Sequence, residues 1–120
     1  MSGLEAEIAE LTRDLNDTYI EAVHKRESLK GKMDELERKL SAAHGAQALC
    51  LGEELELASN RLNELCDSLC LASKGCKERV LALEDRATAA GFDVQLDKAK
   101  ATAKRIEEVA SDLLCYSLGR

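Results

Sequence analysis

The sequence predicts an all-α protein: an antiparallel coiled-coil hairpin with a shorter third helix packed back on it, giving an elongated three-helix bundle. The first observation is compositional. The chain of 120 residues has no proline and no tryptophan, and its aromatic residues are two tyrosines and one phenylalanine. Apolar residues make up 45% and charged residues 33% of the chain, which is typical of long helices and poor in the residues that strands favour.

The second observation is that apolar residues recur at alternating intervals of four and three, the spacing of a coiled-coil seam. The length favours one helical domain over residues 1–120. Together these features predict three helices in succession, each with an apolar stripe.

The first helix is expected over residues 3–43. Its apolar residues keep the four-three rhythm apart from a stutter between Leu15 and Tyr19, and Arg26 is the exception within the stripe. Ser2 and Glu5 fit a capping box at its start. Gly45 is expected to take the left-handed position that ends it.

The second helix is expected over residues 46–90. Gly75 lies in its middle as a possible kink, but a glycine inside a helix costs only about 1 kcal/mol, so a bent and continuous helix is expected. A second, weaker apolar line on one flank indicates a further helical neighbour; it consists of Cys50, Leu57 and Leu71.

The third helix is expected over residues 93–118. Gly91 is suited to the left-handed position after the second helix, and Phe92 would cover Ala87 as in a Schellman motif. Asp93 is expected to cap the next helix.

The arrangement follows from the lengths. The first two helices would each span about 60–67 Å at 1.5 Å per residue, and short loops make successive helices antiparallel neighbours. The third helix would then cover the half of the hairpin that holds residues 4–24 and 66–90, leaving the half around the 44–45 turn as a bare two-helix coiled coil. The alternative is a single long helix through His44 and Gly45 in a parallel dimer.

Charge argues against several classes of partner. The formal net charge is −6, and the densest basic cluster, within residues 98–105, is surrounded by acidic side chains, so no nucleic-acid partner is expected. No apolar run approaches the ~20 residues that span a bilayer. The acidic polar faces disfavour a membrane surface, and Met1–Glu5 resembles neither a secretory signal nor a myristoylation site.

The cysteines predict free thiols. The five are Cys50, Cys66, Cys70, Cys76 and Cys115. An odd number at irregular spacing favours a cytoplasmic or other reducing compartment. A zinc site would need Cys66, Cys70 and Cys115 to converge with His24, yet Cys115 lies roughly 200° around the helix from Leu113. No metal site is therefore predicted.

Catalytic motifs are also lacking. The sequence contains no glycine-rich phosphate loop and no hydrolase or metalloprotease signature. Its carboxylates lie on the polar faces of periodic helices, where no pocket would shift their pKa values. The chain is expected to be non-enzymatic, with no catalytic residue, cofactor or small-molecule substrate.

The most informative stretch is the end of the third helix, which is apolar nearly all the way round. The candidate partner-binding residues are Val109, Leu113, Leu114, Tyr116 and Leu118. They either lie clasped between two helices or form a docking patch for a partner helix or a second copy. Tyr116 is the natural anchor of such a patch, because tyrosine is enriched among the residues that dominate binding energy.

The sequence therefore predicts a coiled-coil protein–protein interaction module, an adaptor or scaffold subunit of a larger assembly. Its partners would be proteins that bind through helix faces, and a homodimer is one such case. Two alternatives stay open: a self-associating structural protein of cytoskeletal type, and a helical bundle that senses metal or redox state through its cysteines.

Overall fold

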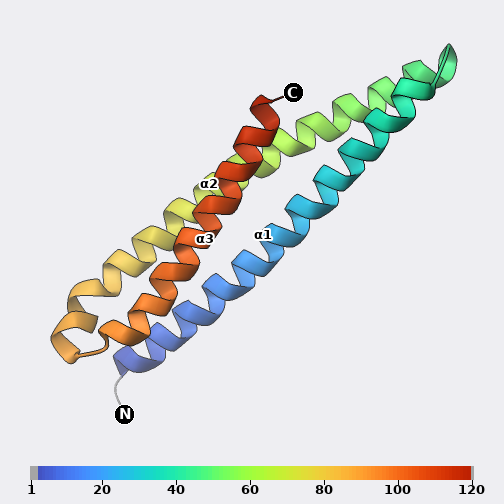
Figure 1. Ribbon diagram of the computed structural model, residues 1–120. Coiled ribbons are helices and arrows are strands. Elements are labelled where there is room, and N and C mark those ends of the chain that lie inside the picture. Colours follow the sequence, from blue (N-terminus) through green and yellow to red (C-terminus); the bar gives the residue numbers. More distant parts are fainter. Residues whose placement is uncertain (1–2, 120) are drawn as a thin grey trace.

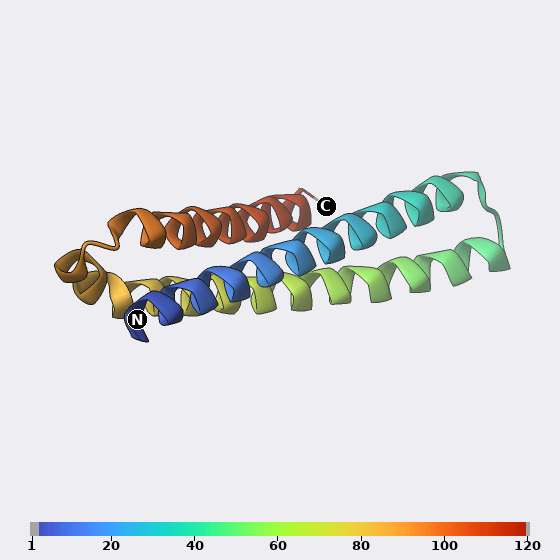
Figure 2. The same cartoon turned by 90° about the horizontal axis from the view of Figure 1, so that it is seen from below.

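The computed structural model describes residues 3–119, which form three helices and no strand (Figure 1). Helix α1 spans Gly3–Ala42, α2 spans Ala46–Ala90 and α3 spans Asp93–Leu118. The chain reverses between α1 and α2 and again between α2 and α3, so α3 lies back along the hairpin (Figure 2). The molecule measures 67 × 20 × 15 Å. The expected fold class, an elongated three-helix bundle, is confirmed. The chain does not form a single long helix through His44 and Gly45, because α1 ends at Ala42 and α2 begins at Ala46.

The connection between α2 and α3 is a Schellman motif. Gly91 adopts the left-handed conformation, with φ 78° and ψ 22°. Its N–H donates to the Thr88 carbonyl at 3.2 Å, and the Phe92 N–H donates to the Ala87 carbonyl at 2.8 Å. These two bonds satisfy carbonyls that the helix end leaves open. Asp93 lies inside the first turn of α3 and does not cap the helix, so that expectation is wrong. Its negative charge still stabilises the helix, because it lies near the positive end of the helix dipole.

The connection between α1 and α2 differs from the expected one. Gly45 has φ 62° and ψ −133°, a positive φ that favours glycine but not the left-handed helical conformation. It is the residue before α2, and its carbonyl accepts the first helical bond from the Leu49 N–H at 3.2 Å. Gly45 therefore begins α2 rather than ending α1, so the expected left-handed helix end is wrong. The expected capping box involves Ser2, which lies outside the described residues.

Two contiguous clusters of buried side chains fill the space between the helices. The first joins the start of α1, the end of α2 and the start of α3, and the second joins residues 22–36 of α1 and 58–69 of α2 to the end of α3. Thr102, only 5% exposed, lies on α3 and approaches Asn16 of α1, with 3.2 Å between Thr102 Oγ1 and Asn16 Oδ1. Alanines at the contacts, such as Ala99 and Ala110, let the helix backbones approach closely. Helix α2 runs unbroken through Gly75.

One feature of the expected packing is wrong. The second apolar line of α2 has no helix against it within the described chain: Cys50 is exposed, and Leu57 and Leu71 are 59% and 72% exposed. Helix α3 lies instead along the flank of α2 that carries Lys77, which forms an ion pair with Glu107 of α3. The periodicity identified an apolar line but not which neighbour would cover it.

Candidate interaction surface at the end of α3

Helix α3 stops well short of the turn at residues 43–45 (Figures 1 and 2). The hairpin continues beyond it as two helices, which we call the arm: residues 35–42 of α1, residues 46–60 of α2 and the turn between them. The position of α3's end along the hairpin is fixed by Ser117, whose hydroxyl donates to Asn63 Oδ1 at 2.9 Å. The apolar end of α3 therefore lies where a three-helix bundle changes into a two-helix hairpin.

The structure divides the five candidate residues between the core and the surface. Val109 and Leu113 are 3% and 0% exposed and belong to the second core cluster. Leu114 and Leu118 are 45% and 78% exposed. Tyr116 is half-buried at the edge of the cluster. Two of the five are thus clasped between helices, and two are available to a partner.

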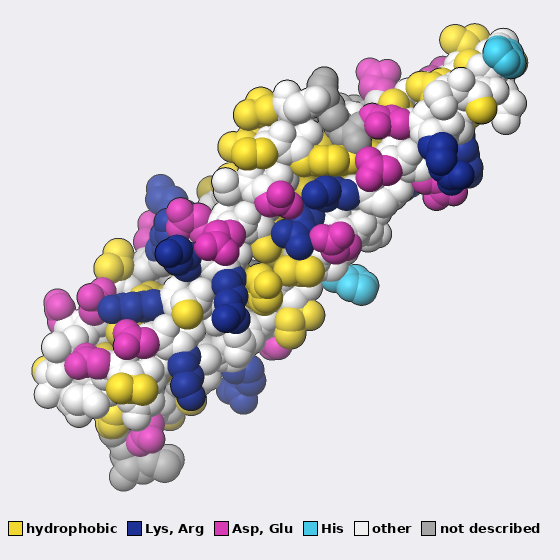
Figure 3. Space-filling view, viewed as in Figure 1, with side chains coloured by type: hydrophobic (Ala, Val, Ile, Leu, Met, Phe, Trp, Pro, Cys, Tyr) yellow, Lys and Arg dark blue, Asp and Glu magenta, His cyan; other side chains and the backbone are white. Residues whose placement is uncertain are grey.

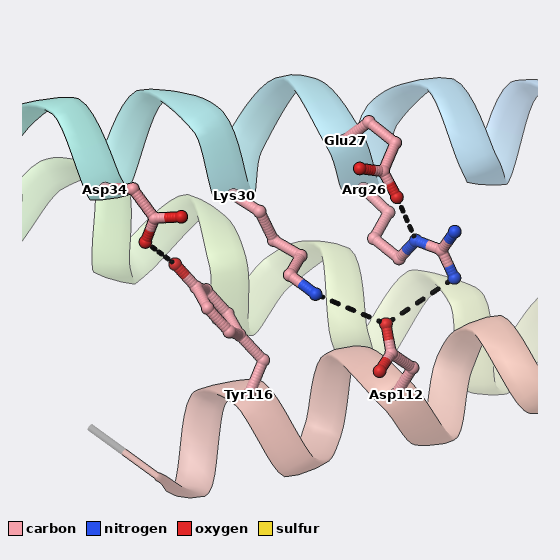
Figure 4. A network of polar contacts seen from close by, with 6 residues as sticks. All are labelled: Arg26, Glu27, Lys30, Asp34, Asp112 and Tyr116. Atoms are coloured by element: carbon pink, nitrogen blue, oxygen red, sulfur yellow. Dashed lines mark hydrogen bonds and ion pairs between the residues drawn. The ribbon is translucent and has the colours of Figure 1, made fainter.

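Tyr116 is bound within the chain (Figure 4). Its hydroxyl donates to Asp34 Oδ1 at 2.8 Å, and the Lys30 ammonium lies 4.9 Å from the centre of its ring. Burial raises the pKa of Tyr116 to about 12, and the hydrogen bond to Asp34 and the negative charge of that carboxylate act in the same direction. The side chain that looked like a binding anchor instead fastens α3 to α1.

A second set of polar contacts joins the same two helices. Asp112 of α3 lies 3.5 Å from both Arg26 and Lys30 of α1, and Arg26 also pairs with Glu27 at 2.9 Å (Figure 4). Each of these partly exposed pairs contributes between 0 and about 1 kcal/mol, but together they fix how far α3 slides along α1. They also explain Arg26, which interrupts the apolar stripe because its partner is an acidic residue of α3.

Sequence reasoning missed this network, although one signal pointed to it. An arginine within an apolar stripe is costly unless a carboxylate pairs with it. The acidic residues of the third helix were therefore the place to look, and Asp112 lies one turn before Tyr116.

On the other side of α3, Leu114 faces a shallow groove between α2 and α3. Cys70, Ser73 and Lys74 line it from α2, and Ala110 lines it from α3. In the space-filling view, hydrophobic side chains are visible beside the end of α3 and again near the 43–45 turn (Figure 3). Leu114 thus lines a groove formed by residues 70–77 of α2 and 107–114 of α3, whereas Leu118 is exposed at the end of α3.

The cysteines are all free thiols. Cys66 and Cys76 are buried, whereas Cys50, Cys70 and Cys115 are exposed. Burial raises the pKa of the Cys66 thiol, with nearby Cys70 and Asp67 adding to it, and burial likewise raises the pKa of Cys76. Among residues 3–119, no group of three His, Cys, Asp or Glu side chains is placed to hold a metal ion.

No helix within the described chain is long and apolar enough to cross a membrane. Comparison of the sequence and structure with protein families, curated proteins and solved structures found no match.

Proposed function

We propose that this protein is a non-enzymatic helical interaction module, which binds a partner protein through a helix face as an adaptor or scaffold subunit of a larger assembly. The observation that carries the proposal is the pair Leu114 and Leu118, exposed one turn apart at the end of α3. Residues four apart lie on the same face of a helix, so the two leucines form one apolar strip.

The fold does not need this strip. Val109 and Leu113 already complete the core at this level, and the polar contacts of Asp112 and Tyr116 hold α3 to α1. Leaving large apolar side chains in water forgoes roughly 25 cal/mol for each Å² that could be buried. Contiguous exposed apolar surface with a polar rim is typical of protein interaction sites.

Other features support the rest of the proposal. The net charge of −6 disfavours a nucleic-acid partner. Protonated thiols are poor nucleophiles, so the raised pKa values of the buried cysteines fit packing rather than catalysis. Five free cysteines fit a cytoplasmic or other reducing compartment.

The test is quantitative affinity capture from a cell extract with mass spectrometry. The variant is Leu114→Ser with Leu118→Ser, and the matched control is Leu71→Ser with Leu81→Ser, which changes two leucines of α2 that are 72% and 65% exposed. We expect at least one protein to be captured equally by wild type and control and at least tenfold less by the variant, with thermal midpoints within about 4 °C of the wild type. Equal capture by all three proteins would overturn the proposal.

A sedimentation series on the same proteins tests the structural alternative. A module with a distinct partner should sediment independently of its concentration. Growth of the wild type into large assemblies with rising concentration, abolished in the Leu114 and Leu118 variant, would make the protein a self-associating structural protein instead.

A further inference from the structure

We propose, building on the interaction function above, that the arm binds a basic amphipathic helix of the partner, laid end to end with α3 on the same side of the hairpin. The reason is that the side of the hairpin covered by α3 continues into the arm with the same pattern of residues.

The apolar part of this pattern repeats with the seven-residue period of the coiled coil. Under α3, Met33, Leu62 and Cys66 are 0%, 1% and 5% exposed. Their equivalents one heptad into the arm are Leu40, Leu55 and Ser59, and all three are only half-buried. These three positions of the arm therefore keep small or apolar side chains that could contact a third helix, and they gain exposure where α3 stops.

The α2 side of this surface also carries side chains small enough for a helix to approach closely. Along the flank of α2 that faces α3, steps of three and four residues lead from Ser59 to Leu55, Gly52 and Ala48, all half-buried. Small residues at such positions permit close helix contact, as the alanines of α3 already show. The α2 part of the arm, residues 46–60, is about 22 Å long at 1.5 Å per residue, which suits a partner helix of about four turns.

The charges at the rim determine the character of the occupant. Lys30 of α1 contacts Asp112 and the Tyr116 ring of α3. One heptad further along, its equivalent is Glu37, so the charge at this edge changes sign. On the opposite edge, Asn63 bonds to Ser117, and its equivalent is Glu56. Both edges of the arm thus carry a glutamate, and lysine or arginine on the flanks of an occupying helix would complement this charge.

The overall charge of the arm points the same way. Residues 35–60 contain five glutamates, balanced by Arg38 and Lys39, a net charge of −3. A second copy would bring an arm of the same sign, and like charges in apposition oppose association. A basic helix from another protein is the occupant that both the half-buried side chains and the charges at the rim favour, with Leu118, 78% exposed, at the inner end of its site.

The test uses the full chain and two synthetic helical peptides of 14 residues. Both peptides carry leucine and alanine at four-three spacing; one has lysine and arginine on its flanks, and the other has glutamate. Binding is measured by fluorescence anisotropy at low salt, and the site is located by amide chemical shifts. We expect the basic peptide to bind at least tenfold more tightly than the acidic one, with shifts concentrated in residues 36–60.

Charge reversal provides the control. Glu37→Lys with Glu56→Lys should weaken binding of the basic peptide at least tenfold and strengthen binding of the acidic one. Glu78→Lys with Asp85→Lys makes the same change of net charge at exposed positions elsewhere on α2 and should leave binding within twofold. Equal binding of both peptides, an equal effect of the two reversals, or shifts outside the arm would overturn the inference, and so would a dimer of the wild type that the arm reversal dissociates.

The two proposals can fail separately. If the basic peptide does not bind but capture of a cellular protein still depends on Leu114 and Leu118, the interaction function stands and this inference is wrong. If the peptide binds at the arm but no captured protein depends on those leucines, the function assigned to the end of α3 is wrong.

Discussion

Loss of one hydroxyl group at Tyr116 should measurably loosen α3. In Tyr116→Phe the ring stays in place beside Lys30, but the 2.8 Å bond to Asp34 is lost. Hydrogen bonds to charged groups contribute about 1.5–3 kcal/mol when well shielded. This bond is exposed and both groups are hydrated in the unfolded chain, so we expect a loss of about 1 kcal/mol.

An effect of this size is large enough to measure by thermal unfolding. An unfolding entropy of roughly 2.1 cal/mol/K per residue makes 1 kcal/mol correspond to about 4 °C in thermal midpoint for a chain of this length. Urea unfolding followed by circular dichroism should give the same change. A double-mutant cycle with Asp34→Ala isolates the pair from the other contacts of each residue. A coupling energy below about 0.3 kcal/mol, within the error of additivity, would refute the reasoning.

The pH dependence gives an independent check with a definite sign. The pKa of Tyr116 rises from 10 to about 12 in the folded protein, chiefly through burial. The folded state therefore holds the phenol proton more tightly than the unfolded state does, and this contribution to stability is complete below pH 10. It is lost as the pH rises through about 12. The free energy of unfolding should fall more steeply over this range in the wild type than in Tyr116→Phe, and parallel curves would contradict the assignment.

Three further predictions follow from burial and backbone conformation. Gly75→Ala should raise the free energy of unfolding by about 0.5–1 kcal/mol, because its added methyl group meets open space inside a helix. Gly91→Ala should lower the free energy of unfolding by about 1–2 kcal/mol, because φ at this residue is 78°. Equal effects of the two substitutions in urea unfolding would contradict the turn geometry. Leu113→Ala should cost about 2–5 kcal/mol, whereas Leu114→Ala should cost less than about 1 kcal/mol; the reverse order would mean that α3 is rotated. In native thiol labelling the exposed cysteines should react quickly and Cys66 only on unfolding, since burial both shields it and raises its pKa; fast reaction of all five would contradict the packing.

The fold was predictable because its main determinants are local. Four-three spacing determines which face of each helix is apolar, and Gly91 followed by Phe92 marks a helix end by the bonds that those two N–H groups make. The conformation of Gly45 was not predictable in the same way, since the residues around it did not show whether this glycine ends α1 or begins α2. The exposed line through Leu57 shows the same limit: periodicity gives a face, but not the neighbour that covers it.

The candidate site was predictable as a region but not residue by residue. Neighbouring residues point about 100° apart around a helix, so Leu113 and Leu114 meet different surroundings, and Leu113 is 0% but Leu114 45% exposed. Which of the two is buried depends on the rotation of α3 about its own axis. That rotation is fixed by contacts between residues far apart in the sequence, such as Asp112 with Arg26 and Tyr116 with Asp34. Composition alone carries no information on these pairings.

The docking proposal and the role of Tyr116 depend on each other. If polar bonds hold the end of α3, Leu118 has no part in attaching the helix and its apolar surface is free for a partner. If those bonds do not form in solution, the last turn of α3 would be free to turn Leu118 inward onto Leu55 and Leu40, and the strip would belong to the fold. Leu114→Ser with Leu118→Ser distinguishes these cases, because it should lower the thermal midpoint by less than about 4 °C in the first case and by more in the second.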